Sequence, residues 1–387
     1  MHPRHLLSLL AAFLLLPFLA TPGHAQEMND SDRPTARELG LTIGIFQPGE
    51  HNAITDVRGV QVGQTTVVEG GDVRTGVTAI LPHPGDLFRE RVPAAMYVGN
   101  GFGKLVGVTQ VRELGELETP ILLTCTLCVW QAANAMVDWM LDRPGMGNVR
   151  SINPVVGETN DGALNDIRSR PIRPEHVVQA LEEASDGPVA QGSVGAGTGT
   201  RAFGWKGGIG TASRVLPESL GGYRVGVLVQ SNFGGMLTVD GVRVGEALGR
   251  YSFRGAVEAD EGDGSIMIVV ATDAPLSDRN LERLASRAIM GLARTGSFAG
   301  NGSGDYVIAF STAEGVRRVS GDDVPTVQDL PNSATSALFQ GVVEATEEAV
   351  VNSVLKATTV TGHGGTTAEA ISLDELVPLL REAGRIP

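Results

Sequence analysis

Two cysteines are all that the 387-residue chain contains, and aromatic residues make up only 5% of it. Cys125 and Cys128 form a single Cys-x-x-Cys pair, which by itself is half of a typical zinc site, and no second pair completes it. The pair lies within the apolar stretch Ile121–Trp130, so we expect both thiols to be reduced and packed in the core. A disulfide is the alternative if the protein is exported to an oxidising compartment.

Histidine is also scarce, which limits the catalytic chemistry that the chain can support. Beyond residue 25 no two histidines stand at the spacing of a metal-binding pair, so neither a metal nor another cofactor is expected. These histidines are His51, His83, His176 and His363. The Gly-x-Ser-x-Gly motif of the α/β-hydrolases is absent, although a Ser-His-Asp triad assembled in space stays open. The glycine-rich stretch Gly192–Gly210 lacks the ending of a phosphate loop and predicts tight turns and close-packed strands instead.

Basic residues are outnumbered, with 30 lysines and arginines against 44 aspartates and glutamates and a net charge of −14. This acidic balance argues against nucleic acid or an anionic membrane as a partner. Long apolar runs are missing too, except for Leu6–Leu16 near the N-terminus. That run follows the basic Arg4 and precedes the small residues Gly23–Ala25, the pattern of a cleavable signal peptide, and it is too short to span a bilayer comfortably.

These features divide the chain into three parts. We predict a signal peptide over residues 1–25, with an uncleaved membrane anchor as the alternative. A polar, flexible segment is expected over residues 26–40, and a single domain over residues 41–387. After removal of the signal, the protein is expected to be periplasmic or secreted and to make no contact with the membrane.

Strand-like and helical patterns alternate along the rest of the chain without a clear linker, which is typical of one compact α/β domain. Continuous apolar runs at Tyr223–Gln230 and Ile266–Ala271 predict strands that are covered on both faces. Helices are predicted where apolar residues recur at helical spacing, over Val129–Leu141, Pro174–Ala184, Ser277–Ala293, Gly341–Lys356 and Ser372–Ala383.

Ser265 opens one of these apolar strands, directly after Gly264 and a polar, acidic stretch. If the Gly264–Ser265 bond breaks, Ser265 becomes an N-terminus with both a hydroxyl and a free amine. An α-amine with a pKa of about 7.7–8.0 can take up the hydroxyl proton near neutral pH without a histidine. The hydroxyl can break that bond itself by attacking the Gly264 carbonyl, after which water hydrolyses the ester. Glycine tolerates the distorted turn that this attack needs.

A set of motifs follows the order found in one hydrolase family, from about Gly40 to Gly365. They are Asn52–Val57 with Gly59–Gly63, Pro154–Gly162, Lys206–Arg214, Val227–Asn232, Gly264–Ser265 with Ala271–Leu276, Ala293–Gly296 and Ser303–Asp305. Through them the chain resembles the β-peptidyl aminopeptidase and L-aminopeptidase/D-esterase family. The resemblance implies a four-layer αββα sandwich. It also implies a precursor cut between Gly264 and Ser265 into a larger and a smaller chain that stay together, and a homo-oligomer, a tetramer or larger.

The resemblance further implies a role for each of five side chains. Ser265 is similar to the family's nucleophile, and Asn232 to its oxyanion-hole donor. Ser303 matches the serine that contacts the nucleophile's amine. Asp305 stands where some members have glutamate, and its side chain is one methylene shorter. Glu158 resembles the carboxylate that pairs with the free amino group of the substrate.

These residues predict an enzyme that releases N-terminal residues from small peptides, amides or esters. The residues released would be β-amino acids, or small D- or L-alanine-like residues. Two related enzyme groups are alternatives, the endo-acting nylon-oligomer hydrolases and the ornithine acetyltransferases, but both use threonine as the nucleophile. Serine at position 265 and the export signal favour the peptidase. A non-catalytic small-peptide-binding protein of the same fold is the alternative from another functional class.

Overall fold

The computed structural model describes residues 33–254, 264–319, 321 and 326–387, and the predicted signal peptide lies outside them. The larger of its two main sheets contains β3 (Glu90–Gly101), β4 (Glu116–Leu117), β9 (Ile209–Val215), β10 (Arg224–Asn232), β11 (Ser265–Thr272), β12 (Gly304–Ser311) and β13 (Arg318–Val319). The strand order is β13-β3-β12-β11-β10-β9, with β4 paired to β3. The neighbours β11 and β12 are parallel, whereas β10 runs antiparallel to β11.

The smaller main sheet contains β1 (Gln61–Glu69), β2 (Val73–Leu81), β5 (Ile121–Cys125) and β6 (Val155–Thr159), in the order β1-β2-β5-β6. Two short ribbons complete the β structure that is described, β7 (Arg201–Ala202) with β8 (Trp205–Lys206) and β14 (Val360–Thr361) with β15 (Thr367–Ala368). Close backbone packing explains the glycines of Gly192–Gly210, as predicted. A Cβ on Gly208 would lie 2.2 Å from the carbonyl oxygen of Gly192.

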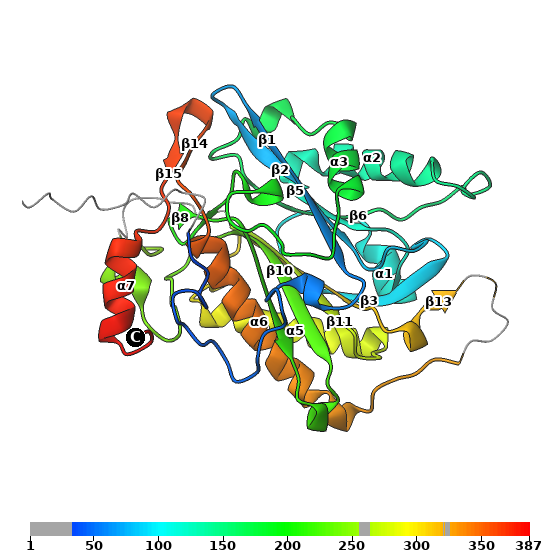
Figure 1. Cartoon of the computed structure of the whole chain (residues 1–387). Coiled ribbons are helices and arrows are strands. Elements are labelled where there is room, and N and C mark those ends of the chain that lie inside the picture. The colour runs from blue at the N-terminus through cyan, green and yellow to red at the C-terminus, as the bar shows by residue number, and fades with distance from the viewer. Residues whose placement is uncertain (1–32, 255–263, 320, 322–325) are drawn as a thin grey trace, which may run out of the picture.

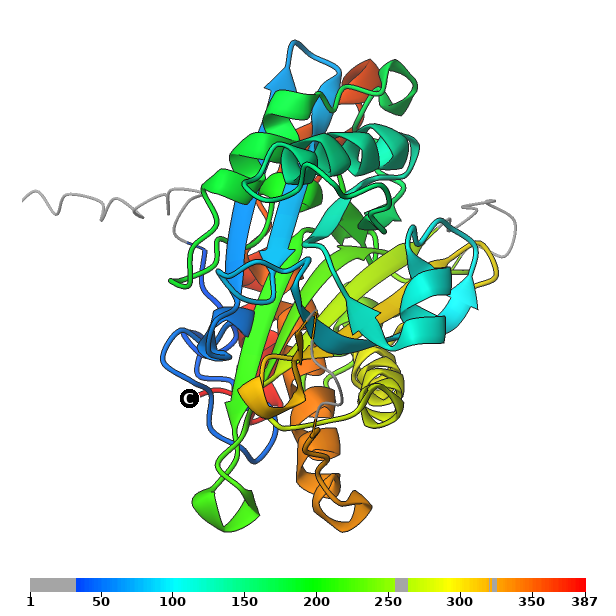
Figure 2. The same ribbon diagram turned by 90° about the vertical axis from the view of Figure 1, so that its right-hand side faces the viewer.

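Helices cover the outer faces of both sheets. The pair α2 (Val129–Leu141) and α3 (Pro174–Glu182) lies on one side of the two sheets, and α5 (Asp278–Arg294) and α6 (Ser336–Leu355) lie on the other (Figures 1 and 2). The shorter helices are α1 (Val108–Leu114), α4 (Val244–Ala247) and α7 (Leu373–Glu382). Within the described ranges, no helix has both the length and the apolar character needed to cross a membrane.

Three apolar clusters fill the three spaces between these layers. Representative members are Leu122 and Met136 between the smaller sheet and α2, Ile121 and Met267 between the two sheets, and Ile268 and Leu284 between the larger sheet and α5. Each fully buried side chain of this kind contributes about 1.5–3 kcal/mol to folding. The prediction of a four-layer αββα sandwich is confirmed.

Strand β11 lies between two apolar clusters, which explains its continuous apolar sequence. Met267 and Val269 face the cluster between the sheets, whereas Ile266, Ile268 and Val270 face the cluster under α5 and α6. Since successive side chains of a strand point to opposite faces, a strand at this position needs apolar residues on both faces, and Ile266–Ala271 provides them. All eight residues of β11 are buried, which confirms the prediction that this strand is covered on both faces.

The predicted helices are all present, with small differences at their ends. Helix α2 has the predicted bounds, and α3, α5 and α7 differ from the predictions by one or two residues. Helix α6 begins at Ser336, five residues before the predicted Gly341. The earlier start adds the apolar Leu338, which is fully buried in the core beneath the larger sheet.

Two expectations are corrected by the structure. Arg33–Gly40 was expected to belong to a flexible segment, but Ala36 is fully buried and its amide donates a hydrogen bond of 2.8 Å to Asn352 Oδ1 on α6. Cys125 and Cys128 were expected to be reduced, but they form a disulfide between the end of β5 and the start of α2. Both cysteines are buried, as the apolar context indicated.

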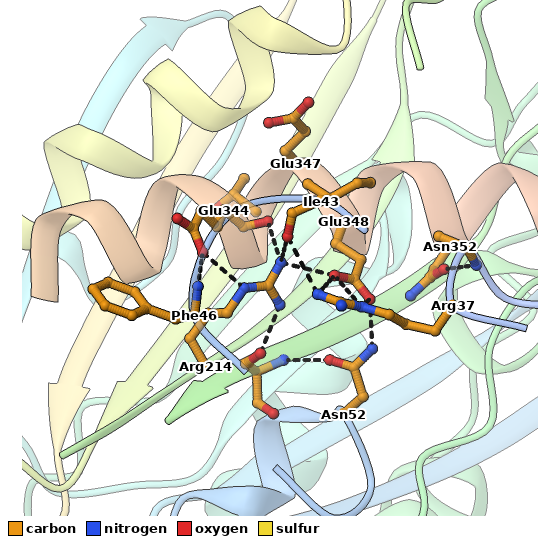
Figure 3. A network of polar contacts seen from close by, with 12 residues as sticks. Arg37, Ile43, Phe46, Asn52, Arg214, Glu344, Glu347, Glu348 and Asn352 are labelled. Atoms are coloured by element: carbon orange, nitrogen blue, oxygen red, sulfur yellow. Dashed lines mark hydrogen bonds and ion pairs between the residues drawn. The ribbon is translucent and has the colours of Figure 1, made fainter. Parts of the chain in front are cut away.

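A buried network of charges joins α6 to the larger sheet and to the N-terminal segment (Figure 3). Arg214 on β9 is fully buried, and its guanidinium lies 3.1 Å from Glu344 Oε2 and 2.7 Å from Glu348 Oε2. Arg37 contacts Glu348 Oε2 from the other side at 3.0 Å, and Asn52 donates a hydrogen bond of 2.6 Å to Glu348 Oε1. Two arginines thus balance two glutamates, and the hydrogen bonds offset much of the cost of removing these charges from water.

We predict that Arg214→Ala lowers the free energy of unfolding by about 3–5 kcal/mol, because it leaves two buried carboxylates short of a partner. Urea denaturation of the purified protein measures this loss. The matched control is Arg243→Ala, which removes an exposed ion pair with Glu246 and is expected to cost less than about 1 kcal/mol. A loss for Arg214→Ala as small as that of the control would contradict the role given to this network.

Candidate active site

The larger sheet brings three of the predicted site segments to one edge. Ser265 is the first residue of β11, and its direct partners in the neighbouring strands are Asn232 at the end of β10 and Gly304 at the start of β12. Because β10 is antiparallel to β11, its carboxyl end meets the amino ends of β11 and β12 at the same edge. Residues 232, 265 and 303–305 therefore lie together although they are far apart in sequence.

The Ser265 hydroxyl lies directly against the preceding peptide bond. Ser265 Oγ donates a hydrogen bond of 2.7 Å to the carbonyl oxygen of Gly264, and Ser265 is buried. The amide of Gly304 is shared between these two groups, since its nitrogen lies 3.3 Å from Ser265 Oγ and 3.3 Å from the Gly264 oxygen. An N–H donor at this place can stabilise negative charge on the Gly264 oxygen during an attack on its carbonyl. This role of the Gly304 amide was not predicted from the sequence, because the pairing of β12 with β11 alone brings the amide to Ser265.

Asn232 is held in a fixed orientation by two backbone contacts. Its Nδ2 donates a hydrogen bond of 2.9 Å to the carbonyl oxygen of Asn160, and its Oδ1 accepts one of 3.0 Å from the amide of Arg201. An amide nitrogen carries two N–H groups, so the bond to Asn160 leaves one of them for another acceptor. The predicted oxyanion donor is therefore rigid and stands beside Ser265 in the sheet.

Ser303 and Asp305 form a hydrogen-bonded pair at the start of β12. The Ser303 hydroxyl donates to Asp305 Oδ1 at 2.7 Å, so the shorter aspartate reaches its neighbour. Burial raises the pKa of Asp305, and the hydrogen bond from Ser303 partly opposes this shift. Asp305 Oδ2 is buried without a hydrogen-bond partner. The Ser303 oxygen keeps its lone pairs free to accept a further donor.

Glu158 on β6 lines the same cavity as Ser265. This cavity has a volume of about 280 Å³, and Gly264, Thr126 and Phe102 also line it. The Glu158 carboxylate accepts a hydrogen bond of 2.8 Å from the amide of Lys104, whose ammonium lies 3.8 Å away. Burial raises the pKa of Glu158, and the Lys104 contacts lower it in part. Glu158 therefore presents a buried carboxylate, only 2% exposed, to a cavity that holds a serine hydroxyl.

The structure places Asn232, Ser265, Ser303 and Asp305 at neighbouring strand ends and Glu158 on the cavity that Ser265 lines. Lys104 and the Gly304 amide lie beside them. Lys104 follows a glycine-rich turn with no motif that would mark it, so only its contact with Glu158 reveals it. In the part of the chain that the structure describes, no three His, Cys, Asp or Glu side chains are grouped so that they could hold a metal ion.

The chain matches the family described as peptidase family S58 over residues 52–368. It belongs to peptidase family S58. It is 42% identical over 376 residues to the β-peptidyl aminopeptidase BapA of Sphingosinicella microcystinivorans, covering 92% of this chain and 94% of that relative. This S58 member is accordingly an aminopeptidase, a hydrolase that acts on peptide bonds.

Solved structures of related enzymes show the same fold. A β-aminopeptidase from Burkholderia sp. has a TM-score of 0.83 and 40% identity, covering 92% of this chain and all (100%) of that one. The L-aminopeptidase D-Ala-esterase/amidase of Ochrobactrum anthropi has a TM-score of 0.83 and 37% identity, with the same coverage of 92% and 100%. That enzyme is described as a prototype for the serine aminopeptidases with a variant of the Ntn hydrolase fold.

This S58 aminopeptidase also contains two buried ionisable groups whose charges interact, Asp161 and Lys206. Lys206 is fully buried and donates to the carbonyl oxygens of Gly197 (2.8 Å) and Gly207 (2.6 Å), and burial lowers its pKa to about 7. Burial raises the pKa of Asp161 to about 7. Asp161 directly follows Asn160, whose carbonyl oxygen accepts the hydrogen bond from Asn232.

We predict that Asp305→Asn stabilises the folded protein near pH 8 and that the gain disappears near pH 4. The folded-state pKa of Asp305 is raised, so its carboxylate destabilises the fold above that pKa, and this penalty is lost as pH falls and the group is protonated. The neutral asparagine lacks the penalty at every pH. Tm measured across this pH range tests the prediction, with the exposed Asp142→Asn as the matched control. A variant less stable than wild type near pH 8 would contradict it.

Proposed function

We propose that this aminopeptidase is made as a precursor that cleaves its own Gly264–Ser265 bond and then uses the freed Ser265 as its nucleophile. The observation that carries the proposal is the Ser265 hydroxyl, 2.7 Å from the Gly264 oxygen at the edge of a rigid sheet, in one cavity with the buried Glu158. The two products stay together as one fold, because β11 and β12 of the smaller product pair with β10 and β3 of the larger one.

Self-cleavage starts with attack of Ser265 Oγ on the Gly264 carbonyl carbon. The acyl group moves from the Ser265 nitrogen to its oxygen, the nitrogen takes up a proton, and the Gly304 amide stabilises the charge on the carbonyl oxygen. Water then hydrolyses the ester. The reaction leaves a carboxylate on Gly264 and an amine and a hydroxyl on Ser265.

Turnover of a substrate repeats the chemistry on an incoming peptide, amide or ester. The Ser265 amine takes the hydroxyl proton while Oγ attacks the substrate carbonyl, and the free N–H of Asn232 stabilises the oxyanion. The amine returns the proton to the leaving group, and water hydrolyses the acyl-enzyme. Because the Ser303 hydrogen points to Asp305, the Ser303 oxygen can accept an N–H of the Ser265 amine and hold it in place.

Glu158 makes the reaction specific for N-terminal residues. A substrate ammonium satisfies the buried carboxylate, whereas an internal peptide bond leaves it without this partner, which is costly. This contact favours an exopeptidase over an endo-acting, nylon-oligomer-type hydrolase. The residues released are β-amino acids or small D- or L-alanine-like residues, and the relatives named β-peptidyl aminopeptidase and β-aminopeptidase support the first of these classes.

The proposal extends to the cellular location and the oligomeric state of the enzyme. We propose that residues 1–25 direct the precursor to the periplasm or out of the cell, and that the processed protein forms a homo-oligomer, a tetramer or larger. The leader pattern supports the first statement and the family resemblance supports the second.

Self-cleavage predicts two fragments in the purified protein, of roughly 25 and 13 kDa by scaling the chain mass of 40.4 kDa to residue number. The smaller fragment should begin Ser-Ile-Met-Ile. Ser265→Ala should give one uncut chain, because it removes the attacking hydroxyl. Intact mass and N-terminal sequencing measure this, with the exposed Ser151→Ala as a control that should be cut normally. An uncut wild-type chain, or a cut Ser265→Ala chain, would overturn the mechanism.

Glu158→Gln is expected to reduce kcat/KM for aminoacyl p-nitroanilides by about 10- to 100-fold, mainly through KM, because it removes one buried ion pair with the substrate. In the wild type KM should also rise as pH falls through the raised pKa of Glu158, since only the carboxylate binds the ammonium. Steady-state kinetics across pH check both points, with the exposed Glu183→Gln as the control. An unchanged KM in a correctly processed Glu158→Gln enzyme would refute the role of Glu158.

A further inference from the structure

Gly264 lines a second cavity besides the one that Ser265 and Glu158 line. This second cavity has a volume of about 120 Å³, and its lining includes Phe233, Phe253, Phe298 and Ser303. We call it the aromatic cavity. Gly264 lines both cavities, and a Cβ on Gly264 would lie 2.9 Å from Phe233 Cα. Gly264 is thus part of the wall between them.

The aromatic cavity has features that the fold itself does not require. Phe253 and Phe298 are 78% and 55% exposed, although burial of such rings is favourable, and their centroids lie 5.7 Å apart. Phe253 also has a φ of 66°, in the left-handed region that bulky residues rarely adopt. Backbone strain of this kind is characteristic of functional sites. Neither ring adds to the core, so both are available to contact a ligand.

The proposed function indicates where each part of a substrate would lie. The N-terminal residue of the substrate lies in the first cavity, because its ammonium pairs with Glu158, and its carbonyl lies at Ser265. The leaving group must then extend away from Glu158, past Ser265. Gly264, which lines both cavities, becomes a chain end once its bond to Ser265 is cut. Ser303, beside the reacting amine, lines the second one.

We propose that the aromatic cavity is the subsite for the leaving group and that it selects substrates whose second residue is aromatic or large and apolar. The proposal rests on the proposed function, since it needs Ser265 as the nucleophile. None of the described side chains that line the cavity carries a charge, and its polar side chains are the neutral ones of Ser252, Ser297, Asn301 and Ser303. The charge that self-cleavage adds is the Gly264 carboxylate, which repels a second carboxylate. A second residue with a neutral, amidated end therefore fits better than one with a free carboxylate.

The test compares amidated dipeptides that share one N-terminal residue and differ only in the second residue, Gly, Ala, Leu or Phe. Wild-type kcat/KM should be about 10-fold higher for Phe than for Ala, which corresponds to partial burial of one ring. Phe298→Ala should reduce this ratio to about 2-fold or less and leave the preference among β-alanyl, D-alanyl and L-alanyl N-termini unchanged. Phe298 is more than half exposed, so its loss does not open the core.

Leu114→Ala, a change of an exposed apolar residue on α1, is the matched control and should keep the wild-type ratio. Equal kcat/KM for Phe and Ala in an active wild-type enzyme would overturn the assignment of this subsite. An unchanged ratio in Phe298→Ala would overturn it as well, while leaving the proposed function intact. A wild-type protein that hydrolyses none of the peptides would instead refute the proposed function, and this inference with it.

Discussion

The pairing of Ser265 with Asn232 on one side and Gly304 on the other is the contact on which the site depends. It fixes the start of β11 within a sheet that is buried on both faces, so the hydroxyl, the side-chain amide and the backbone amide cannot move apart without breaking the core. A site built on strand ends in this way is more precise than one built on free loops. With the strand start fixed in this way, the Ser265 hydroxyl lies within hydrogen-bond distance of the Gly264 carbonyl oxygen.

The stability of the rest of the fold compensates for site residues whose burial is unfavourable. The balanced network around Arg214 and the three apolar clusters stabilise the fold, whereas burial disfavours the charged forms of Glu158 and Asp305. Asp305 Oδ2 has no hydrogen-bond partner, and Phe253 has a strained backbone. Residues that serve binding and catalysis are often kept at such a cost to stability.

Most helices and the two buried strands followed from apolar periodicity, because it reports directly which face of an element is buried. The four-layer arrangement came from the family resemblance. Ser265 could be singled out because it opens an apolar strand, and the family resemblance added the other side chains. The contacts between distant residues could not be predicted. Arg37 pairs with Glu348, 311 residues away, so a polar segment that looked flexible is held to α6. The contact of Lys104 with Glu158 and the position of the Gly304 amide likewise arise only when the strands are assembled.

If Ser265 is the nucleophile, it carries the acyl group of the substrate during turnover, and this acyl-enzyme can be trapped. The processed protein is mixed with an excess of an alanyl or β-alanyl ester, quenched in acid during turnover, and its chains are weighed by intact mass spectrometry. We expect the smaller chain to gain the mass of one aminoacyl group and fragmentation to place this group on Ser265. An adduct on another residue, or product formation with no adduct on Ser265 at any quench time, would contradict it.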